Sequence, residues 1–193
     1  MRQGHAATGR SQISRTALAI AMTLSVVASA ACSPAQDEAA RRAAAFRCAN
    51  GGPADVTRTL AVGRATQLDD NFNVGDAYRV EANPSGTISF GVGQSVFEGD
   101  RGSWGPDGKR SDLAPDGSSF PLPGQPKFAL IGVFNQTPSH WFLLGSHSTC
   151  QVAVQAPSPP NFPGSVIFKA NDDFSVSERG TWTVTVFEFH GSR

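Results

Sequence analysis

Lysine is scarce in this sequence of 193 residues, where it occurs only at Lys109, Lys127 and Lys169. Three of the 16 Lys and Arg residues, but none of the 16 acidic residues, precede Cys32, so the chain from Cys32 onward has a formal charge of −3. Nucleic acids and anionic lipid surfaces are bound through clustered Lys and Arg. The composition therefore argues against both as partners.

The N-terminal region also lacks an apolar run long enough to span a bilayer, which needs about 20 residues. The run from Ala17 to Ala28 has only 12 residues, follows a basic start without acids and leads into the small residues Ala28-Ser29-Ala30-Ala31. These features together define a secretory signal peptide, which we place at residues 1–31. No Arg-Arg pair precedes the run, which favours secretion of an unfolded chain over twin-arginine export.

The signal peptide can be cleaved in two ways. Ala28-Ser29-Ala30 fits an A-x-A cleavage site. Ser29-Ala30-Ala31-Cys32 instead resembles a lipobox, in which Cys32 becomes the acylated first residue, although Ser29 stands where Leu is usual. The chain has three cysteines, and an odd free thiol is a liability in an oxidising compartment. The cysteine count therefore favours the lipobox.

Acylation of Cys32 leaves two further cysteines, Cys48 and Cys150. We expect these two to form a disulfide. In the chain-entropy treatment, closing a loop of about 100 residues stabilises the fold by up to about 4.7 kcal/mol. Two unpaired buried thiols are the alternative.

The residue after Cys32 bears on where the anchor lies. Ser33 stands there, not the Asp that is associated with retention in the inner membrane. We expect an exported protein that a palmitate-type acyl chain anchors in the outer membrane, facing the periplasm or the cell surface. A soluble periplasmic or secreted protein is the alternative.

Residues 32–47 form a segment of distinct composition between the signal peptide and the rest of the chain. Their Ala, Glu and Arg content supports a short helix once Pro34 is passed. An isolated helix of this length is marginal in water. The segment is either a tether that holds the domain off the membrane or a helix docked on the domain.

Helical periodicity is absent from Cys48 onward, where Gly, Pro, Ser, Thr, Val and Phe dominate. Short apolar runs separated by turn residues are typical of a β-sandwich or barrel. We therefore predict a single all-β domain, an antiparallel sandwich over residues 48–193, which is long enough to bury a core. The expected strands are Val56–Val62, Ala77–Ala82, Thr87–Phe90, Lys127–Phe134, Trp141–Leu144, Gln151–Gln155, Ser165–Ala170 and Thr181–Phe189.

The last of these strands has the clearest pattern. Trp182, Val184 and Val186 alternate with threonines in the two-residue period of a strand with one buried face. Phe187 and Phe189 then place apolar side chains on the other face. This change predicts a β-bulge or a strand that leaves the sheet.

A stretch without any strand pattern runs from Gly99 to Gly124. Its 26 residues are rich in Gly, Pro, Ser and Asp. Loops of this length are usually functional or disordered. We expect one long loop here, and the sequence alone does not assign a role to it.

Catalytic motifs are missing from the sequence. It contains no G-x-S-x-G nucleophile elbow, and His140 and His147 match no metal-binding spacing, so we expect both histidines at the surface. The run Asp69-Asp70-Asn71-Phe72-Asn73 fails the EF-hand pattern, because Val74 and Val80 stand where Gly and Glu are required. We interpret that run as a solvated turn, and we expect no enzymatic activity.

An acidic cluster follows one of the predicted strands. It consists of Asn171-Asp172-Asp173, with Glu178 five residues further on. Carboxylates crowded on one loop repel each other unless they are exposed or neutralised, and calcium prefers such oxygen-rich loops. Composition alone is equally compatible with a plain acidic hairpin turn and with an ion site.

Four short segments of the chain form an ordered set. They are Asn73-Val74-Gly75-Asp76, Ser89-Phe90-Gly91, Trp104-Gly105-Pro106-Asp107-Gly108, and Gly164 to Asp172 leading to Gly180-Thr181-Trp182-Thr183-Val184. With these segments in this order, the region from about Val56 to Phe189 resembles the small bacterial calcium-dependent galactophilic lectins and the domains related to them. The resemblance implies a jelly-roll-like β-sandwich, in which one calcium ion bridges the protein and sugar hydroxyls.

The resemblance also implies a set of calcium ligands. Asp172 would meet both the ion and the sugar, and Phe90 would offer its backbone carbonyl. Ser177 and Glu178 stand where the lectins have two Asn ligands. Serine is a poor ligand for calcium, whereas Glu178 is a plausible one and Asp173 could supply a further oxygen.

The segment that contacts sugar in the lectins departs from the family pattern. Lys109 to Gln125 has no His-Pro, and about nine residues, Ser95 to Ser103, are inserted before Trp104. Galactose specificity is therefore not carried over. Trp104 is a candidate for stacking on a sugar face, and packing under a loop is its alternative.

Two functions of different class follow. The first is a non-enzymatic envelope lipoprotein that binds a carbohydrate or another ligand with calcium as cofactor, through Asp172 and Trp104. The second is a structural or protein-interaction lipoprotein that keeps the sandwich without a working sugar site, with unknown protein partners. A resemblance in fold does not decide between them.

The lipobox interpretation makes a direct prediction. Cells expressing the full chain and grown with labelled palmitate should incorporate label into the wild-type protein and not into a Cys32→Ser variant, because the acyl chain is carried on that sulfur. Protein gel fluorography measures the incorporation. Equal labelling of the two proteins would contradict acylation at this residue.

Overall fold

The computed structural model describes residues 34–90, 102–155, 164–173 and 178–191. The predicted signal peptide, Cys32 and Ser177 lie outside the described residues. The described part contains one helix and otherwise antiparallel strands, which confirms the expected all-β sandwich. No helix in these ranges has the length and hydropathy needed to cross a membrane.

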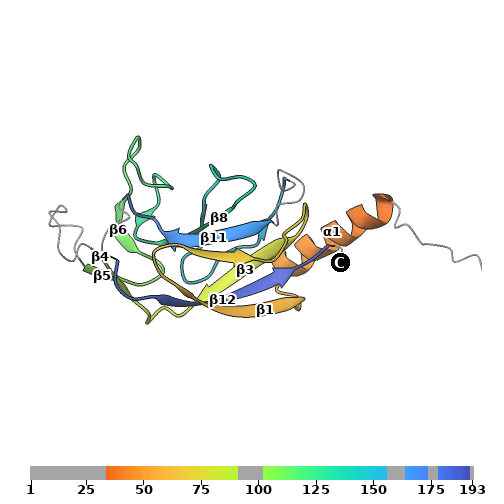
Figure 1. Cartoon of the computed structure of the whole chain (residues 1–193), viewed down its shortest axis with the longest axis horizontal. Coiled ribbons are helices and arrows are strands. Elements are labelled where there is room, and N and C mark those ends of the chain that lie inside the picture. The colour runs from red at the N-terminus through yellow and green to blue at the C-terminus, as the bar shows by residue number, and fades with distance from the viewer. Residues whose placement is uncertain (1–33, 91–101, 156–163, 174–177, 192–193) are drawn as a thin grey trace, which may run out of the picture. The chain divides into compact units, whose positions relative to one another are not determined.

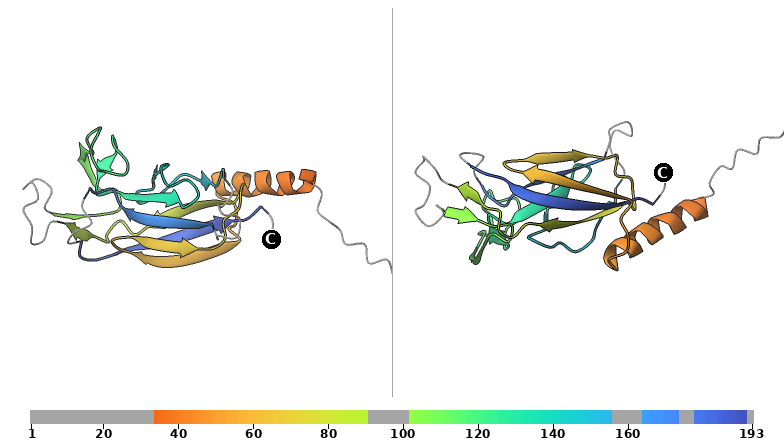
Figure 2. Two further views of the ribbon diagram at one scale, coloured as in Figure 1. Left: turned by 45° about the horizontal axis from the view of Figure 1, so that its top comes forward. Right: turned by 90° about the horizontal axis from the view of Figure 1, so that it is seen from below.

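The described elements are α1 Pro34–Ala49, β1 Val56–Val62, β2 Thr66–Asp69, β3 Ala77–Ala82, β4 Ile88–Phe90, β5 Gly102–Trp104, β6 Lys109–Leu113, β7 Pro126–Lys127, β8 Leu130–Phe134, β9 Phe142–Leu143, β10 Gln151–Val152, β11 Ser165–Ala170 and β12 Trp182–Phe189. Two four-stranded antiparallel sheets form the sandwich, with strand orders β1-β12-β3-β10 and β2-β11-β8-β9, and two shorter pairs, β4-β5 and β6-β7, extend it. Figures 1 and 2 show the two large sheets as layers, with β4 and β5 at one end and α1 and the C-terminus at the other.

The two large sheets pack face to face around an apolar core. The core takes Val80 and Val184 from one sheet and Leu130 and Phe168 from the other, and each of these is at most 1% exposed. Full burial of a side chain of this kind stabilises the fold by about 1.5–3 kcal/mol. The core therefore fixes the turns at each end of the sandwich relative to one another.

Strand β12 keeps its register through the position at which the sequence predicts a bulge. It pairs with β1 and with β3 without a break up to Glu188 and Phe189. The predicted bulge is therefore wrong. Glu188 takes the inward position after Val186 and is fully buried, while Phe187 and Phe189 lie on the outer face, where Phe189 packs under α1.

Three strands form where the sequence shows no strand pattern. Strands β5 and β6 both lie within the stretch that was expected to be one long loop, so that prediction is wrong for the described part, residues 102–124. Strand β2 was missed as well. These strands have three to five residues and mostly small or polar side chains, so they carry no alternation of apolar and polar positions. Backbone pairing with a neighbouring strand holds each of them.

The helix has an N-terminal and a C-terminal signal of its own. Pro34 begins it, because the fixed φ of proline suits a first helical turn. Gly51, with φ of 67°, ends it, and the N–H of Gly52 donates to the carbonyl of Arg47 at 2.8 Å. This is a Schellman-type cap, which supplies partners for carbonyls that the helix leaves open.

Helix α1 is docked on the sandwich. Ala44 and Cys48 on one side of the helix pack against Ala77 and Phe189 at the end of the β1-β12-β3-β10 sheet. Of the two interpretations that the composition allowed, the docked helix describes residues 34–47. The apolar residues of β12 change face because the helix covers the outer face at this end.

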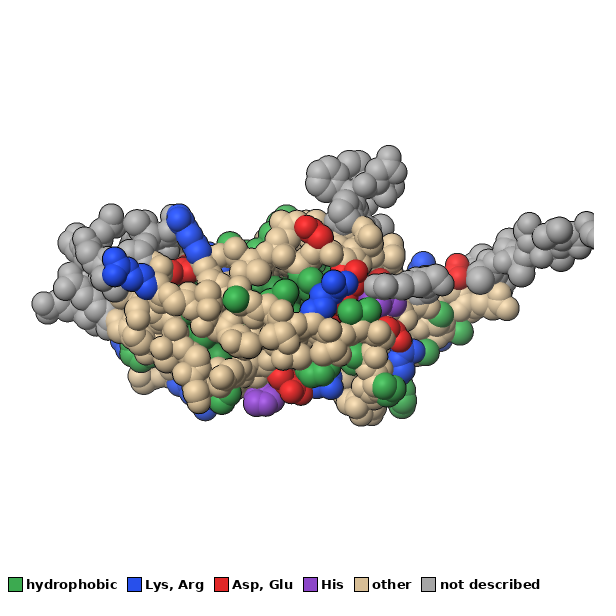
Figure 3. Space-filling model, turned by 60° about the horizontal axis from the view of Figure 1, so that its bottom comes forward, with side chains coloured by type: hydrophobic (Ala, Val, Ile, Leu, Met, Phe, Trp, Pro, Cys, Tyr) green, Lys and Arg blue, Asp and Glu red, His purple; other side chains and the backbone are tan. Residues whose placement is uncertain are grey.

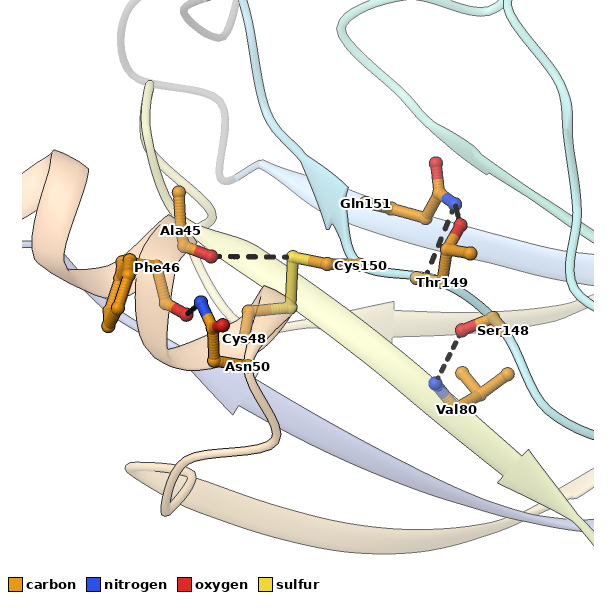
Figure 4. The surroundings of a disulfide bond; sticks show 9 residues. All are labelled: Ala45, Phe46, Cys48, Asn50, Val80, Ser148, Thr149, Cys150 and Gln151. Carbon is orange, nitrogen blue, oxygen red and sulfur yellow. Dashed lines mark hydrogen bonds between the residues drawn. A yellow bond between two sulfur atoms is a disulfide. The ribbon is translucent and has the colours of Figure 1, made fainter.

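A disulfide joins Cys48 and Cys150, as the cysteine count predicts. The bond links positions 102 residues apart, with a Cα–Cα distance of 5.6 Å. Figure 4 shows how it connects the end of α1 to the segment before β10. Ser148 in the same segment accepts a hydrogen bond at its Oγ from the N–H of Val80 at 2.8 Å, which ties the segment to β3 as well.

Removal of the disulfide should destabilise the fold strongly. A Cys48→Ser/Cys150→Ser variant should lose about 2–5 kcal/mol of unfolding free energy, because the unfolded chain is no longer closed into a loop. Urea unfolding followed by tryptophan fluorescence measures the loss. Wild type in reducing agent should match the variant, and equal unfolding midpoints for oxidised wild type and variant would contradict the prediction.

Candidate functional site

Backbone hydrogen bonds bring two distant segments together at the β4–β5 end of the sandwich. Ser89 in β4 pairs with Arg179, which precedes β12. The N–H of Ser89 donates to the backbone carbonyl of Arg179 at 2.8 Å, and the N–H of Arg179 donates to the backbone carbonyl of Ser89 at 2.9 Å. In an antiparallel pair, the residue after one partner faces the residue before the other. Phe90 therefore lies across from Glu178, but its backbone carbonyl, the predicted ligand group, points to the other edge of β4, toward Gly102 of β5.

Asp172 reaches the same place from the end of β11. Its side chain is only 4% exposed, and Glu178 is half-buried beside it. Asp172 Oδ1 and Glu178 Oε2 are both buried oxygen atoms without a hydrogen-bond partner among the described residues. The Nζ of Lys169 lies 3.4 Å from Asp172 Oδ1 and supplies one positive charge.

The two carboxyl groups interact strongly. Burial raises the pKa of Glu178 to about 8, and the neighbouring carboxyl group of Asp172 adds to the rise. The charges of Lys169 and Arg64 act in the opposite direction without cancelling it. In the absence of a cation, the pair therefore favours a state in which Glu178 holds a proton near neutral pH.

Asn171 has a structural role next to this pair. Its side chain is fully buried, accepts from the N–H of Leu122 at 3.0 Å and donates to the carbonyls of Leu122 and Pro126 at 3.0 and 3.2 Å. These bonds hold part of the segment Lys109 to Gln125 beside Asp172. The lectin resemblance assigns sugar contacts to that segment.

Trp104 is packed rather than open on both sides. Its ring is stacked on Phe128, with a centroid distance of 6.1 Å and an interplanar angle of 6°, and the Nζ of Lys109 lies 5.8 Å from its centroid. Its carbonyl accepts from the indole N–H of Trp182 at 3.1 Å. These contacts are those of a side chain that supports the loop, and they leave its predicted sugar contact untested.

The turn after Trp104 is held in shape by its own residues. Gly108 has φ of 65°, and a Cβ there would collide with the backbone of Lys127 and Ala129. Asp107 accepts from the N–H of Ser146 at 2.7 Å through its Oδ1. The segment is therefore a structural corner at this end of the sandwich.

The remaining predicted residues are placed as follows. Asp173 is half-buried and adjoins Asp172. His140 and His147 are exposed, as the sequence analysis expects. On the face drawn in Figure 3, the Lys and Arg side chains of the described residues are dispersed among polar and apolar ones and form no basic patch.

A second polar cluster lies at the opposite end, where β12 finishes, and the sequence analysis missed it. It contains Asp70, Asp76, Glu188 and His190, of which the last three are at most 9% exposed. Asp70 was expected in a solvated turn, but its side chain is only 13% exposed and pairs with Arg58. The sequence feature that could have revealed this cluster is the pair Glu188 and His190, which are two positions apart and therefore on the same face at the end of the last strand.

Comparison of the chain with family models, with curated proteins and with solved structures finds no match in any of the three. The lectin resemblance therefore rests on the four ordered segments of the sequence. It stays a prediction, and so do the calcium ligands that it implies.

The raised pKa of Glu178 predicts a pH dependence of stability. The folded state holds this proton up to a higher pH than the unfolded state, so the contribution of Glu178 to unfolding free energy falls as pH rises from about 4.5 to about 8. In a chelator-containing buffer, a Glu178→Gln variant should therefore gain stability relative to wild type across this window. Urea unfolding at successive pH values measures the difference.

The matched control is Glu38→Gln, which changes an exposed glutamate of α1. Its stability difference from wild type should stay constant between pH 5 and pH 8. A Glu178→Gln difference that is equally flat would show that the carboxyl group ionises normally in the fold.

Proposed function

We propose that the protein is an exported, lipid-anchored envelope protein whose β-sandwich binds a carbohydrate or a similar polyhydroxylated ligand through a calcium ion at Asp172 and Glu178. The observation that carries the proposal is the meeting of three segments at one end of the sandwich. They are β4, the end of β11 and the residues directly before β12.

The chemistry of the carboxyl pair supports a hard cation as its partner. Two adjacent carboxyl groups whose buried oxygens find no hydrogen-bond partner in the described part of the chain are costly without compensation, and Lys169 supplies a single positive charge. Calcium takes six to eight oxygen ligands at about 2.3–2.6 Å, including carboxylates, backbone carbonyls and waters. Asp172, Glu178 and Asp173 are the described side chains that would hold it, and waters or ligand hydroxyl groups would supply the remaining oxygens.

Polyhydroxylated ligands fit such a site for a simple reason. A calcium ion held by few protein oxygens keeps coordination positions that water or vicinal hydroxyl groups can fill. The segment anchored through Asn171 lies beside Asp172 and would line the sugar, as the lectin resemblance implies. Binding of this kind needs no nucleophile and no general base, in keeping with a non-enzymatic role.

Calcium should bind the purified protein with a stoichiometry of one ion per chain. A calcium concentration 100 times the dissociation constant should raise the unfolding free energy by about 2.7 kcal/mol, because the ion binds the folded state. Asp172→Asn keeps the shape of the side chain and should abolish most of the binding heat and the rise in melting temperature. Isothermal titration calorimetry and thermal unfolding measure both, with Glu38→Gln as the control that still binds.

A glycan array with and without calcium separates the two functions that the sequence leaves open. Calcium-dependent signal on specific glycans, lost in Asp172→Asn, supports the binding function. Calcium binding without any glycan signal would favour the structural or protein-interaction lipoprotein. Absence of calcium binding would contradict the proposal that this site holds the ion.

A further inference from the structure

The polar cluster at the α1 end of the sandwich is built around one buried histidine. His190 follows β12 directly, and its side chain is 4% exposed. Its ring is stacked on Phe72 with a centroid distance of 5.9 Å. Its two nitrogens face different carboxylates: Nδ1 lies 3.3 Å from Asp76 Oδ2, and Nε2 lies 3.4 Å from Asp70 Oδ2 and 3.6 Å from Glu188 Oε2.

Asp76 fixes the orientation of the imidazole. Its Oδ2 also accepts from the N–H of Asn73 at 2.8 Å, and its Oδ1 accepts from the N–H of Gly191 at 2.8 Å, so this carboxylate cannot turn away. A carboxylate at Nδ1 keeps the proton on that nitrogen and directs the lone pair of Nε2 outward. Metal-binding histidines are commonly held by a carboxylate in this way.

Arg58 holds the other two carboxylates by their outer oxygens. Its Nη2 lies 3.0 Å from Asp70 Oδ1, and its Nε donates to Glu188 Oε1 at 2.8 Å. The inner oxygens, Asp70 Oδ2 and Glu188 Oε2, therefore point to the same side as His190 Nε2. Glu188 is fully buried, and its Oε2 has no hydrogen-bond partner among the described residues.

We propose that Asp70, Glu188 and His190 form a binding site for a divalent transition metal of the zinc class. The three ligand atoms lie within 4.8 Å of one another. Around a tetrahedral zinc ion with bonds of about 2.0–2.1 Å, neighbouring ligand atoms are about 3.3–3.4 Å apart. The observed separations of 3.4 and 3.6 Å from Nε2 match this spacing closely.

The charges at this place favour a cation. Asp70, Asp76 and Glu188 are three carboxyl groups gathered around His190, and Arg58 pairs with two of them. A divalent metal between Asp70 and Glu188 would offset the repulsion between these groups. An imidazole ligand also selects zinc, cobalt or nickel over calcium, which prefers all-oxygen sites.

The site has an entry path and an open coordination position. A cavity of about 290 Å³ is lined by Asp70, Asn71, Asn73 and His190. Three protein ligands leave the fourth position of a tetrahedral ion to water or to a small ligand. This site lies at the end of β12 opposite to Asp172, so it is separate from the proposed calcium site.

Zinc titration of the purified protein, stripped of metal with a chelator, tests the proposal. Calorimetry and elemental analysis should give one Zn²⁺ per chain, and tenfold excess Ca²⁺ should not displace it. Glu188→Gln and Asp70→Asn preserve side-chain shape and should weaken zinc binding at least tenfold. Asp76→Asn, which alters only the support of the imidazole, should weaken it about 10–100-fold.

Matched controls separate this site from the rest of the molecule. His147→Gln changes an exposed histidine, and Asp172→Asn disables the proposed calcium site, so both should bind zinc as wild type does. Cobalt in place of zinc should give a visible absorption band that Asp70→Asn loses, provided that circular dichroism shows the variant folded. No zinc binding by wild type, or equal affinity in the folded Asp70→Asn variant, would overturn the proposal.

Discussion

The pairing of β12 on both of its edges is the constraint on which the rest of the structure depends. This strand pairs with β1 from Trp182 to Glu188 and with β3 from Val184 to Phe189, so each of its side chains is committed to one face of the sheet. Its first half places Trp182, Val184 and Val186 in the core. Its second half cannot change face, and the inward position there falls to a glutamate. The cost of burying that carboxyl group is offset by the arginine and the histidine that surround it.

The same strand connects the two polar ends of the sandwich. At its start, the bridge between Ser89 and Arg179 holds the acidic pair of Asp172 and Glu178. At its finish lies His190 with three carboxylates. The two clusters have different chemistry, since one offers only oxygen and the other adds an imidazole nitrogen. The apolar core between the two sheets holds both clusters in place.

The sequence predicts most of the sheets but little of the polar chemistry. Strands such as β1, β3 and β11 were found because alternation or uniform apolarity marks them, and the disulfide followed from the cysteine count. Strands β2, β5 and β6 depend on pairing partners that a local pattern does not reveal. The change of face at Phe187 and Phe189 is visible in the sequence, but its cause is tertiary: a helix covers the outer face, and Glu188 is buried on the inner face.

The disulfide also determines how the molecule bears a mechanical load. When tension is applied to the two ends of a chain, it follows the shortest covalent path, and here that path crosses from Cys48 to Cys150 through sulfur. The strands between these residues are shielded from extension, and only α1 and the segments after Cys150 carry the pull. Tension on the two ends of the chain would therefore first extend α1 and the part of the chain that contains β11 and β12, while the loop between the two cysteines stays closed.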